Sequence, residues 1–165
     1  MKKISVPVSD KTIRDLKVGD KIKISGRIYT GRDAALPKLV KSIKEGKELI
    51  DIEGSAIMHT AVSDAGIAPT TSNKEEIQEN IPELANAGVK IHIGKGALSE
   101  ETIKALNEAN SIFVVTPPAA ALLTSKVKSK KVAAFAEEGM EAIFEMEVEG
   151  IPGVVAVAHG KSIYE

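Results

Sequence analysis

The residues that could do chemistry lie in three short segments, and all three fit the binding of a negatively charged molecule. The segments are residues 29–33, 68–74 and 92–97, and each is predicted to follow a strand and to precede a helix. The first amide groups of a helix have no partner within the helix and carry partial positive charge, so an oxyanion can bind there. Each segment also has a simpler explanation.

In the first segment, Gly31 precedes Arg32 and Asp33. A guanidinium group is planar and can hold a carboxylate through two parallel hydrogen bonds, which makes Arg32 a candidate ligand for a carboxylate. The alternative is a surface ion pair in which Asp33 only favours the start of the following helix. Taken alone, this segment favours the alternative.

In the second segment, a run of hydroxyl side chains that includes Thr70 precedes Lys74. Ser72 and Glu75 have the spacing of a capping box, which explains the hydroxyl groups without any ligand. The functional interpretation makes the hydroxyl groups and Lys74 a polar wall of a site. In isolation, the capping interpretation ranks first.

In the third segment, Lys95 lies between Gly94 and Gly96, directly after a predicted strand. The spacing of a nucleotide-binding P-loop is absent. Glycine nevertheless costs chain entropy and lets a ligand approach the backbone closely. A binding role for Lys95 and a plain turn are equally well supported.

The elements that would position these segments alternate between strand and helix. The predicted strands cover residues 4–6, 21–29, 55–60, 89–93, 111–115, 142–148 and 154–158. The predicted helices cover residues 33–44, 72–84, 99–110, 119–123 and 132–138, with Pro82 expected to kink or divide the second. A basic turn is expected at Lys126–Lys131, and a turn at Gly150–Gly153 would join the last two strands as a hairpin. We therefore expect a single layered α/β domain over residues 1–165 with a mixed sheet.

Composition argues against several classes of protein. Lys and Arg number 22 against 23 for Asp and Glu, and aromatic residues make up 3% of the chain, so nucleic acid is not an expected partner. The absence of Cys excludes disulfides, thiolate zinc sites and an iron–sulfur cluster ligated by this chain. No apolar run approaches the roughly 20 residues that a membrane helix needs. No secretory signal follows the N-terminus, and we expect a soluble, cytoplasmic protein without a membrane partner.

The histidines are less informative than the three segments. His59 lies inside an apolar strand and is interpreted as a core residue, and His92 faces either solvent or a neighbouring side chain. His159 lies at a strand end with nothing to support a role in a site. No spacing of His, Asp and Glu predicts a metal site.

Four short motifs, taken in order, resemble the β subunit of class I fumarate hydratase and L(+)-tartrate dehydratase. The motifs are Gly31–Ala35, Pro69–Ser72, Gly94–Gly96 and Gly139–Ile143, and the resemblance extends to about His159. It implies a swivelling β/β/α fold and a hetero-oligomer with an α subunit that carries a [4Fe-4S] cluster on three Cys. It also implies reversible hydration of fumarate to malate, with no cofactor bound by this chain.

The resemblance further implies roles for individual residues. Arg32 and Lys95 would bind the carboxylates of the substrate, and Thr70 would lie where the family has its proton-abstracting residue. Lys74 stands where the family commonly has Arg, and Leu36 stands where it commonly has His. These two differences leave tartrate or a methylated dicarboxylate as alternative substrates.

Two interpretations from other classes remain. In one, the chain is a non-catalytic dicarboxylate-binding module in which Arg32, Lys74 and Lys95 form a clamp. In the other, it is a scaffold domain whose loops are ordinary helix caps. We rank the hydro-lyase subunit first, the binding module second and the scaffold third.

Overall fold

The computed structural model describes residues 1–63, 66–67, 74–117 and 120–164, without the side chains of residues 74–78 and 120–121. The strands are β1 (Lys2–Val6), β2 (Lys21–Gly31), β3 (Ala56–His59), β4 (Val62–Ser63), β5 (Gly66–Ile67), β6 (Ile91–Gly94), β7 (Ile112–Val115), β8 (Val127–Ala134), β9 (Ile143–Ala158) and β10 (Lys161–Ser162). The helices are α1 (Asp10–Arg14), α2 (Leu36–Lys44), α3 (Lys74–Ala87), α4 (Glu100–Glu108), α5 (Ala120–Ser125) and the 3-10 helix η1 (Ala136–Glu141).

A closed ring of strands forms the centre of the molecule. Strands β2, β3, β6 and β7 are parallel neighbours in that order. Strand β9 runs antiparallel to both β7 and β2 and therefore closes the ring. Strand β1 extends the sheet beside β2, while β8 and β10 pair with β9. The predicted mixed sheet in an α/β fold is confirmed.

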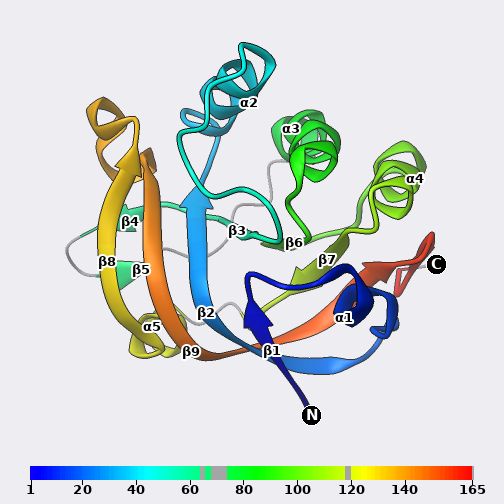
Figure 1. Ribbon diagram of the computed structural model, residues 1–165. Helices are drawn as coiled ribbons and strands as arrows, with labels where there is room; N and C mark the ends of the chain where they lie inside the picture. Colours follow the sequence, from blue (N-terminus) through cyan, green and yellow to red (C-terminus); the bar gives the residue numbers. More distant parts are fainter. Residues whose placement is uncertain (64–65, 68–73, 118–119, 165) are drawn as a thin grey trace.

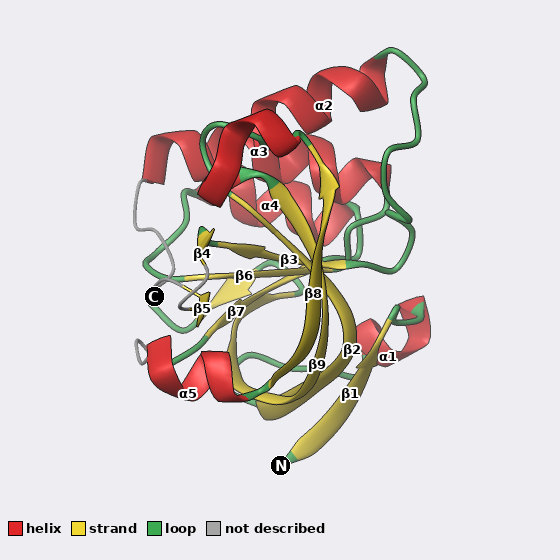
Figure 2. Ribbon diagram, turned by 90° about the vertical axis from the view of Figure 1, so that its left-hand side faces the viewer, coloured by secondary structure: helices red, strands yellow, loops and turns green. Residues whose placement is uncertain are grey.

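Helices cover one outer side of this ring. Figure 1 shows α2, α3 and α4 side by side above the sheet, and Figure 2 shows the strands curving below that layer. The pleat turns alternate residues of each strand to opposite faces. The face inside the ring is aliphatic, with Ile22, Ile24, Ile28, Met58, Ile93 and Val114 in one buried cluster. The opposite face packs under the helices, with Tyr29 and Ile57 in a second cluster and Phe113 in a third.

The predicted hairpin at the end of the chain was wrong, because β9 is one strand from Ile143 to Ala158. Residues Gly150–Gly153, predicted as a turn, lie in the part of the strand that changes neighbours. Before this part β9 pairs with β8, and after it β9 pairs with β7. A Cβ atom on Gly153 would lie 2.5 Å from Val114 Cγ1, so glycine permits the close approach there. Glycine in a strand often marks such a bend at the corner of a barrel.

The predicted basic turn at Lys126–Lys131 and the helix over 132–138 were also wrong. Strand β8 occupies Val127–Ala134 and pairs along β9, and only the short η1 follows it. Pairing with a long neighbour outweighs the weak local preference of these residues. Helix α3 is likewise not divided at Pro82 but runs through it. The predicted cap at Ser99 is confirmed, since its hydroxyl accepts a hydrogen bond from the Thr102 amide at 3.2 Å.

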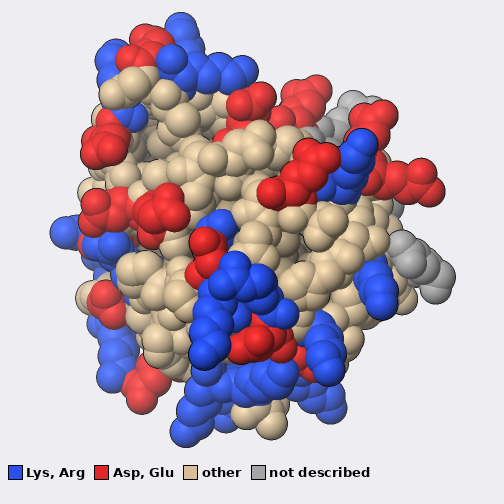
Figure 3. Space-filling view, turned by 45° about the vertical axis from the view of Figure 1, so that its right-hand side comes forward, with Lys and Arg blue, Asp and Glu red and all other residues tan. Residues whose placement is uncertain are grey.

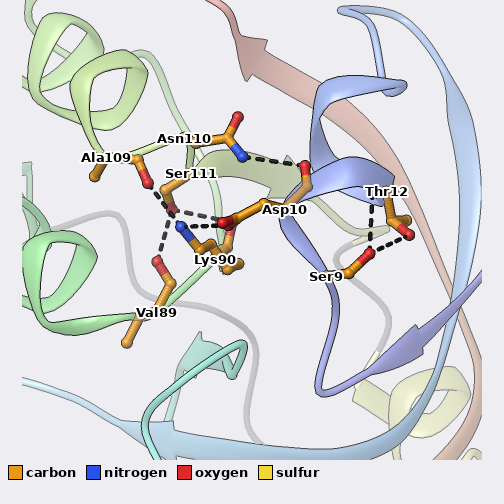
Figure 4. A network of polar contacts seen from close by, with 8 residues as sticks. All are labelled: Ser9, Asp10, Thr12, Val89, Lys90, Ala109, Asn110 and Ser111. Atoms are coloured by element: carbon orange, nitrogen blue, oxygen red, sulfur yellow. Dashed lines mark hydrogen bonds and ion pairs between the residues drawn. The ribbon is translucent and has the colours of Figure 1, made fainter.

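A polar network joins α1 to the amino-terminal ends of β6 and β7 (Figure 4). The Nζ of Lys90 lies 2.9 Å from the Asp10 carboxylate and donates to the Ala109 carbonyl oxygen at 2.9 Å. The side-chain amide of Asn110 donates to the Asp10 carbonyl at 3.1 Å, and the Ser111 hydroxyl donates to the Lys90 carbonyl at 3.0 Å. Lys90 is almost fully buried, so the network replaces the hydration that its ammonium group loses.

We expect Lys90→Met to lower the free energy of unfolding by about 1–3 kcal/mol, the cost of leaving buried hydrogen-bonding groups without a partner. Methionine keeps an apolar stem of similar length, so the loss reports mainly the polar contacts. Urea unfolding followed by circular dichroism measures the change. Lys131→Met is the control, because the Lys131 side chain is 72% exposed beside Glu145 and its loss should leave the midpoint unchanged. Equal shifts in the two variants would contradict the prediction.

Candidate functional site

The first and third predicted segments follow neighbouring parts of one edge of the sheet. Gly31 at the end of β2 pairs with His59 at the end of β3, and the end of β6 lies beside β3 on its other side. Strands in a sheet are about 4.8 Å apart, so Gly31 and Gly94 are separated by about 10 Å. Arg32 and Lys95 follow these two glycines directly. The structure therefore places both cations at the carboxyl edge of the parallel strands.

Arg32 begins the turn that leads into α2. Its carbonyl oxygen accepts a hydrogen bond from the Leu36 amide at 2.9 Å, which closes the turn. A Cβ atom on Gly31 would lie 2.7 Å from Leu36 and 2.8 Å from Ile143, so only glycine lets the helix approach this closely. The Nε of Arg32 is buried and has no hydrogen-bond partner among the residues that the structure describes. The guanidinium group thus keeps a donor available for a ligand or a partner.

Lys95 is exposed at the same edge, in contrast to half-buried Arg32. Gly94 packs against the Phe113 ring, which would lie 3.1 Å from a Cβ atom added to the glycine. Gly96 has a φ of +89°, a left-handed conformation that glycine adopts without strain. Among the residues that the structure describes, Lys95 has no hydrogen bond or ion pair. The two glycines hold the turn and leave the ammonium group in solvent.

The second predicted segment lies mainly outside the described residues. Thr70 and Ser72 are not described, and Lys74 is described only as the first residue of α3, without its side chain. Helix α3 connects parallel strands β3 and β6, so its amino-terminal end lies toward their carboxyl edge. The backbone of Lys74 therefore begins the helix on the side where Arg32 and Lys95 lie. The roles of Thr70 and Lys74 stay predictions.

Two buried histidines lie directly behind this edge. The Nε2 of His59 and the Nδ1 of His92 are 3.3 Å apart, the rings are stacked, and both side chains are fully buried. Burial lowers the pKa of His59 from 6.5 to about 4, although the nearby Asp33 opposes the shift. Burial also holds the pKa of His92 well below 6.5, and His59 adds to the effect. Both rings are neutral at pH 7, with one proton shared between the facing nitrogens.

Buried polar atoms without a hydrogen-bond partner gather at the same edge. Within the described part of the chain there are six such atoms, and the only one remote from this edge is Ser55 Oγ, before β3. The other five lie within two residues of the carboxyl end of a strand: Thr30 Oγ1, Arg32 Nε, His59 Nδ1, His92 Nε2 and Thr116 Oγ1. Each costs about 1–3 kcal/mol if nothing binds it. Within the described residues, these atoms are concentrated at the edge where Arg32 and Lys95 follow their strands.

Sequence analysis missed the histidine pair. His59 was interpreted as a core residue, and burial confirms this, while His92 faces a neighbour and not solvent. The sequence feature that pointed toward the pair was the position of each histidine in a short apolar strand. Only the register that pairs Ile57 with His92 brings the two imidazoles together, and sequence alone does not reveal it. His159 contacts the Leu16 carbonyl oxygen at 2.7 Å, away from this edge.

A basic hollow of about 560 Å³ lies elsewhere, at the first strands and the start of β8. Its lining includes Lys3, Lys23, Lys126 and Lys128, and Lys128 is paired with Glu149. Figure 3 shows Lys and Arg gathered at the lower end of one face and many acidic residues toward the upper right. The nearly balanced net charge therefore hides an uneven distribution. Because exposed lysines on separate strands line this hollow, we interpret it as a solvated surface.

Neither a metal-binding cluster nor a membrane-spanning helix is found in the described part of the chain. In this part, no group of three or more His, Asp or Glu side chains is arranged to hold a metal ion. None of the described helices combines the length and the apolar character that a membrane crossing requires.

Comparison with known proteins gives consistent matches along the chain. The family model "Fumarase C-terminus" matches residues 1–165. A Methanocaldococcus jannaschii protein provisionally named L(+)-tartrate dehydratase subunit beta is 34% identical, over 96% of this chain and 88% of that protein. L(+)-tartrate dehydratase subunit beta of Escherichia coli K12 is 29% identical, over 99% of this chain and 87% of that protein. The anaerobic class I fumarate hydratase of E. coli K12 is 29% identical over 85% of this chain, which spans only 27% of that longer protein.

We expect the protein to lose stability as the pH falls from 6.5 to about 4.5. The unfolded chain takes up protons on His59 and His92 that the folded chain excludes, so each pH unit lowers the free energy of unfolding by up to about 1.4 kcal/mol per histidine. The carboxyl groups of Asp10, Asp20 and Glu149 also have lowered pKa values. They lower the free energy of unfolding only where the pH falls below the ordinary pKa, which is 3.8 for the two aspartates and 4.5 for the glutamate.

Urea unfolding at half-unit steps of pH measures this dependence. The double variant His59→Gln/His92→Gln should show a clearly shallower slope between pH 4.5 and 6.5. A slope equal to that of the unmodified protein would show that the pair does not titrate as described.

Proposed function

This chain belongs to the Fumarase C-terminus family, and we propose that it is the β subunit of a hydro-lyase that reversibly hydrates fumarate to malate. Support comes from relatives named dehydratases and fumarate hydratases. The observation that carries the proposal is the placement of Arg32 and Lys95 at one sheet edge, with the Arg32 Nε buried and unpartnered. That edge suits a small molecule with two carboxylates.

Binding of such a dianion would rest on charge-assisted hydrogen bonds. The Arg32 guanidinium would hold one carboxylate in a fork, and the mobile Lys95 ammonium would neutralise the other. Each bond of this kind contributes about 1.5–3 kcal/mol, so two or three are enough to orient the molecule. Lys74 would add a point charge at the start of α3, without the two-pronged geometry of an arginine.

Proton transfer is assigned to Thr70, on the resemblance of Pro69–Ser72 to the family motif. A threonine hydroxyl is a poor base by itself, so a neighbouring carboxylate or the positive field of the site must activate it. The buried, neutral histidine pair behind the edge would keep water away from the reacting centre and add no competing charge. In this proposal Arg32 and Lys95 bind the substrate, and Thr70 transfers the proton.

A [4Fe-4S] cluster would be held by the α subunit, because this chain contains no Cys to ligate it. When bound, the cluster would supply Lewis-acid polarisation of the substrate. The contribution of this chain would be to close the opposite side of the site with its cationic edge. The active enzyme would then be a hetero-oligomer of the two subunits.

Dehydration of L(+)-tartrate is the second candidate. Relatives that match this chain over most of their own length, such as those from M. jannaschii and E. coli K12, are named as tartrate dehydratase β subunits. At position 36, where the family commonly has His, the chain has a leucine that is buried in the core and packed against Gly31. Leucine in place of histidine at this position would change which substituents a bound dicarboxylate can carry.

Co-purification without oxygen tests both candidates. The chain is expressed with a Cys-bearing α subunit encoded beside it, the cluster is verified by its absorption, and turnover is compared for fumarate, L(+)-tartrate and methylated fumarate. Turnover of fumarate in preference to the others supports the first candidate. An intact cluster with no turnover of any of the acids would exclude a hydro-lyase, and dicarboxylate binding by the chain alone would then favour a binding module.

We expect Arg32→Ala to lower kcat/KM in the complex by roughly 10- to 100-fold, the equivalent of one charge-assisted hydrogen bond. Arg32→Lys should recover only part of the loss, because it restores the charge and not the fork. Arg14→Ala is the matched control, since Arg14 is exposed on α1 at the other end of the ring. Steady-state kinetics of hydration measures the effect, and equal values for Arg32→Ala and the unmodified complex would rule out carboxylate binding by Arg32.

A further inference from the structure

Helix α2, which begins just after Arg32, has no cap from its own segment. The residue at its N-cap position is Ala35, no side chain there forms a capping hydrogen bond, and no acidic residue lies in the first turn. An uncapped helix start leaves amide donors without partners and costs about 1 kcal/mol relative to a capped one. The turn that carries Arg32 is closed by the bond from the Leu36 amide to the Arg32 carbonyl, and no side chain at Ala35 caps the helix that follows.

A residue far away in the sequence accepts a hydrogen bond from the backbone just before this helix. The Oε1 of Glu141 accepts a hydrogen bond from the Ala34 amide at 3.3 Å, across 107 positions of the chain. Glu141 is the last residue of η1, the gold coil above β8 and β9 in Figure 1. Its carboxylate also places negative charge beside the positive end of α2, which favours this helix start.

Further contacts hold η1 against α2. The Lys38 ammonium forms ion pairs with Glu138 and, at 3.6 Å, with Glu137. The same ammonium lies over the Phe135 ring, 5.8 Å from its centre. No residue of η1 is buried, so these contacts and not core packing set its position. Strand β4, on the way to the second candidate segment, also contacts η1.

We propose that Glu141 is a positioning residue that fixes the Arg32 turn for substrate binding. The Leu36 amide closes this turn by donating to the Arg32 carbonyl, and the Ala34 amide within it donates to Glu141. The Arg32 carbonyl and the Ala34 amide, on either side of Asp33, are thus each held by a hydrogen bond. These two bonds fix the backbone from which the Arg32 guanidinium group projects. The inference rests on the proposed function, because it assigns Arg32 to the substrate. Glu141 itself affects substrate binding only by holding this turn in place.

The kinetic test uses the complete α–β complex with Glu141→Ala, Glu141→Gln and the control Glu137→Ala. Glu141→Ala should raise KM for the dicarboxylate about tenfold and change kcat less, since one charged hydrogen bond is lost. Glu141→Gln should restore most of the affinity, because its amide oxygen still accepts from Ala34. Glu137→Ala should have the KM of the unmodified complex, since Lys38 keeps its closer ion pair with Glu138.

A double variant separates positioning from a general loss of stability. In an Arg32→Ala background, Glu141→Ala should raise KM little further, because the group that it positions is gone. A full additional tenfold rise in that background would overturn the proposal. So would an unchanged KM in Glu141→Ala alone.

Hydrogen exchange on the isolated full chain separates failure of this inference from failure of the proposed function. The Ala34 amide should exchange about tenfold faster in Glu141→Ala than in the unmodified chain, the effect of losing one hydrogen bond. Unchanged exchange at Ala34 overturns the inference whatever the activity. An inactive unmodified complex overturns the proposed function. Faster exchange of the Ala34 amide in Glu141→Ala would then still show that Glu141 holds the turn.

Discussion

Closure of the ring by β9 is the constraint on which the rest of the structure depends. The parallel strands β2, β3, β6 and β7 would by themselves form an open sheet with two edges, and β9 joins those edges by pairing with both. Closure removes exposed strand edges and encloses an aliphatic core. Strand β3, which pairs with both β2 and β6, sets the distance between these two strands, and Arg32 and Lys95 follow them.

The two ends of the ring have opposite polar character. At the amino-terminal ends of β6 and β7, the ammonium of Lys90 is matched with a carboxylate and a carbonyl oxygen. At the carboxyl edge, buried donors and acceptors stay unmatched. Among the described residues, Ser55 Oγ is the buried polar atom without a partner at the amino-terminal end, against five at the carboxyl edge, so the carboxyl edge has more groups that a ligand could satisfy. This contrast separates a structural network from a candidate site without reference to any relative.

Local patterns in the sequence predicted much of this architecture. Period-two alternation located β2, apolar β-branched runs located β6 and β7, helical spacing located α2, and Ser99 was identified as a cap. The end of the chain was predicted wrongly, because Gly150 and Pro152 favour a turn in isolation and bend a strand here. Closure and register are long-range properties, so neither the corner of β9 nor the histidine pair was visible locally. Residues of the candidate site were found through their turns. Glu141 was noted only as part of the Gly139–Ile143 motif, and its contact with the Arg32 turn was not predicted, because a contact across 107 positions leaves no local pattern.

The long reach of β9 also has a consequence for the order in which the protein forms. Strand β2 lies in the first fifth of the chain, and the strand that closes the ring on it lies in the last. A growing chain on the ribosome therefore cannot close the ring beside its cationic edge until β9 has been made. Closure over so many residues is entropically slow. The half-built sheet meanwhile exposes unpaired strands, and it is at this stage that chaperones would have the most to protect.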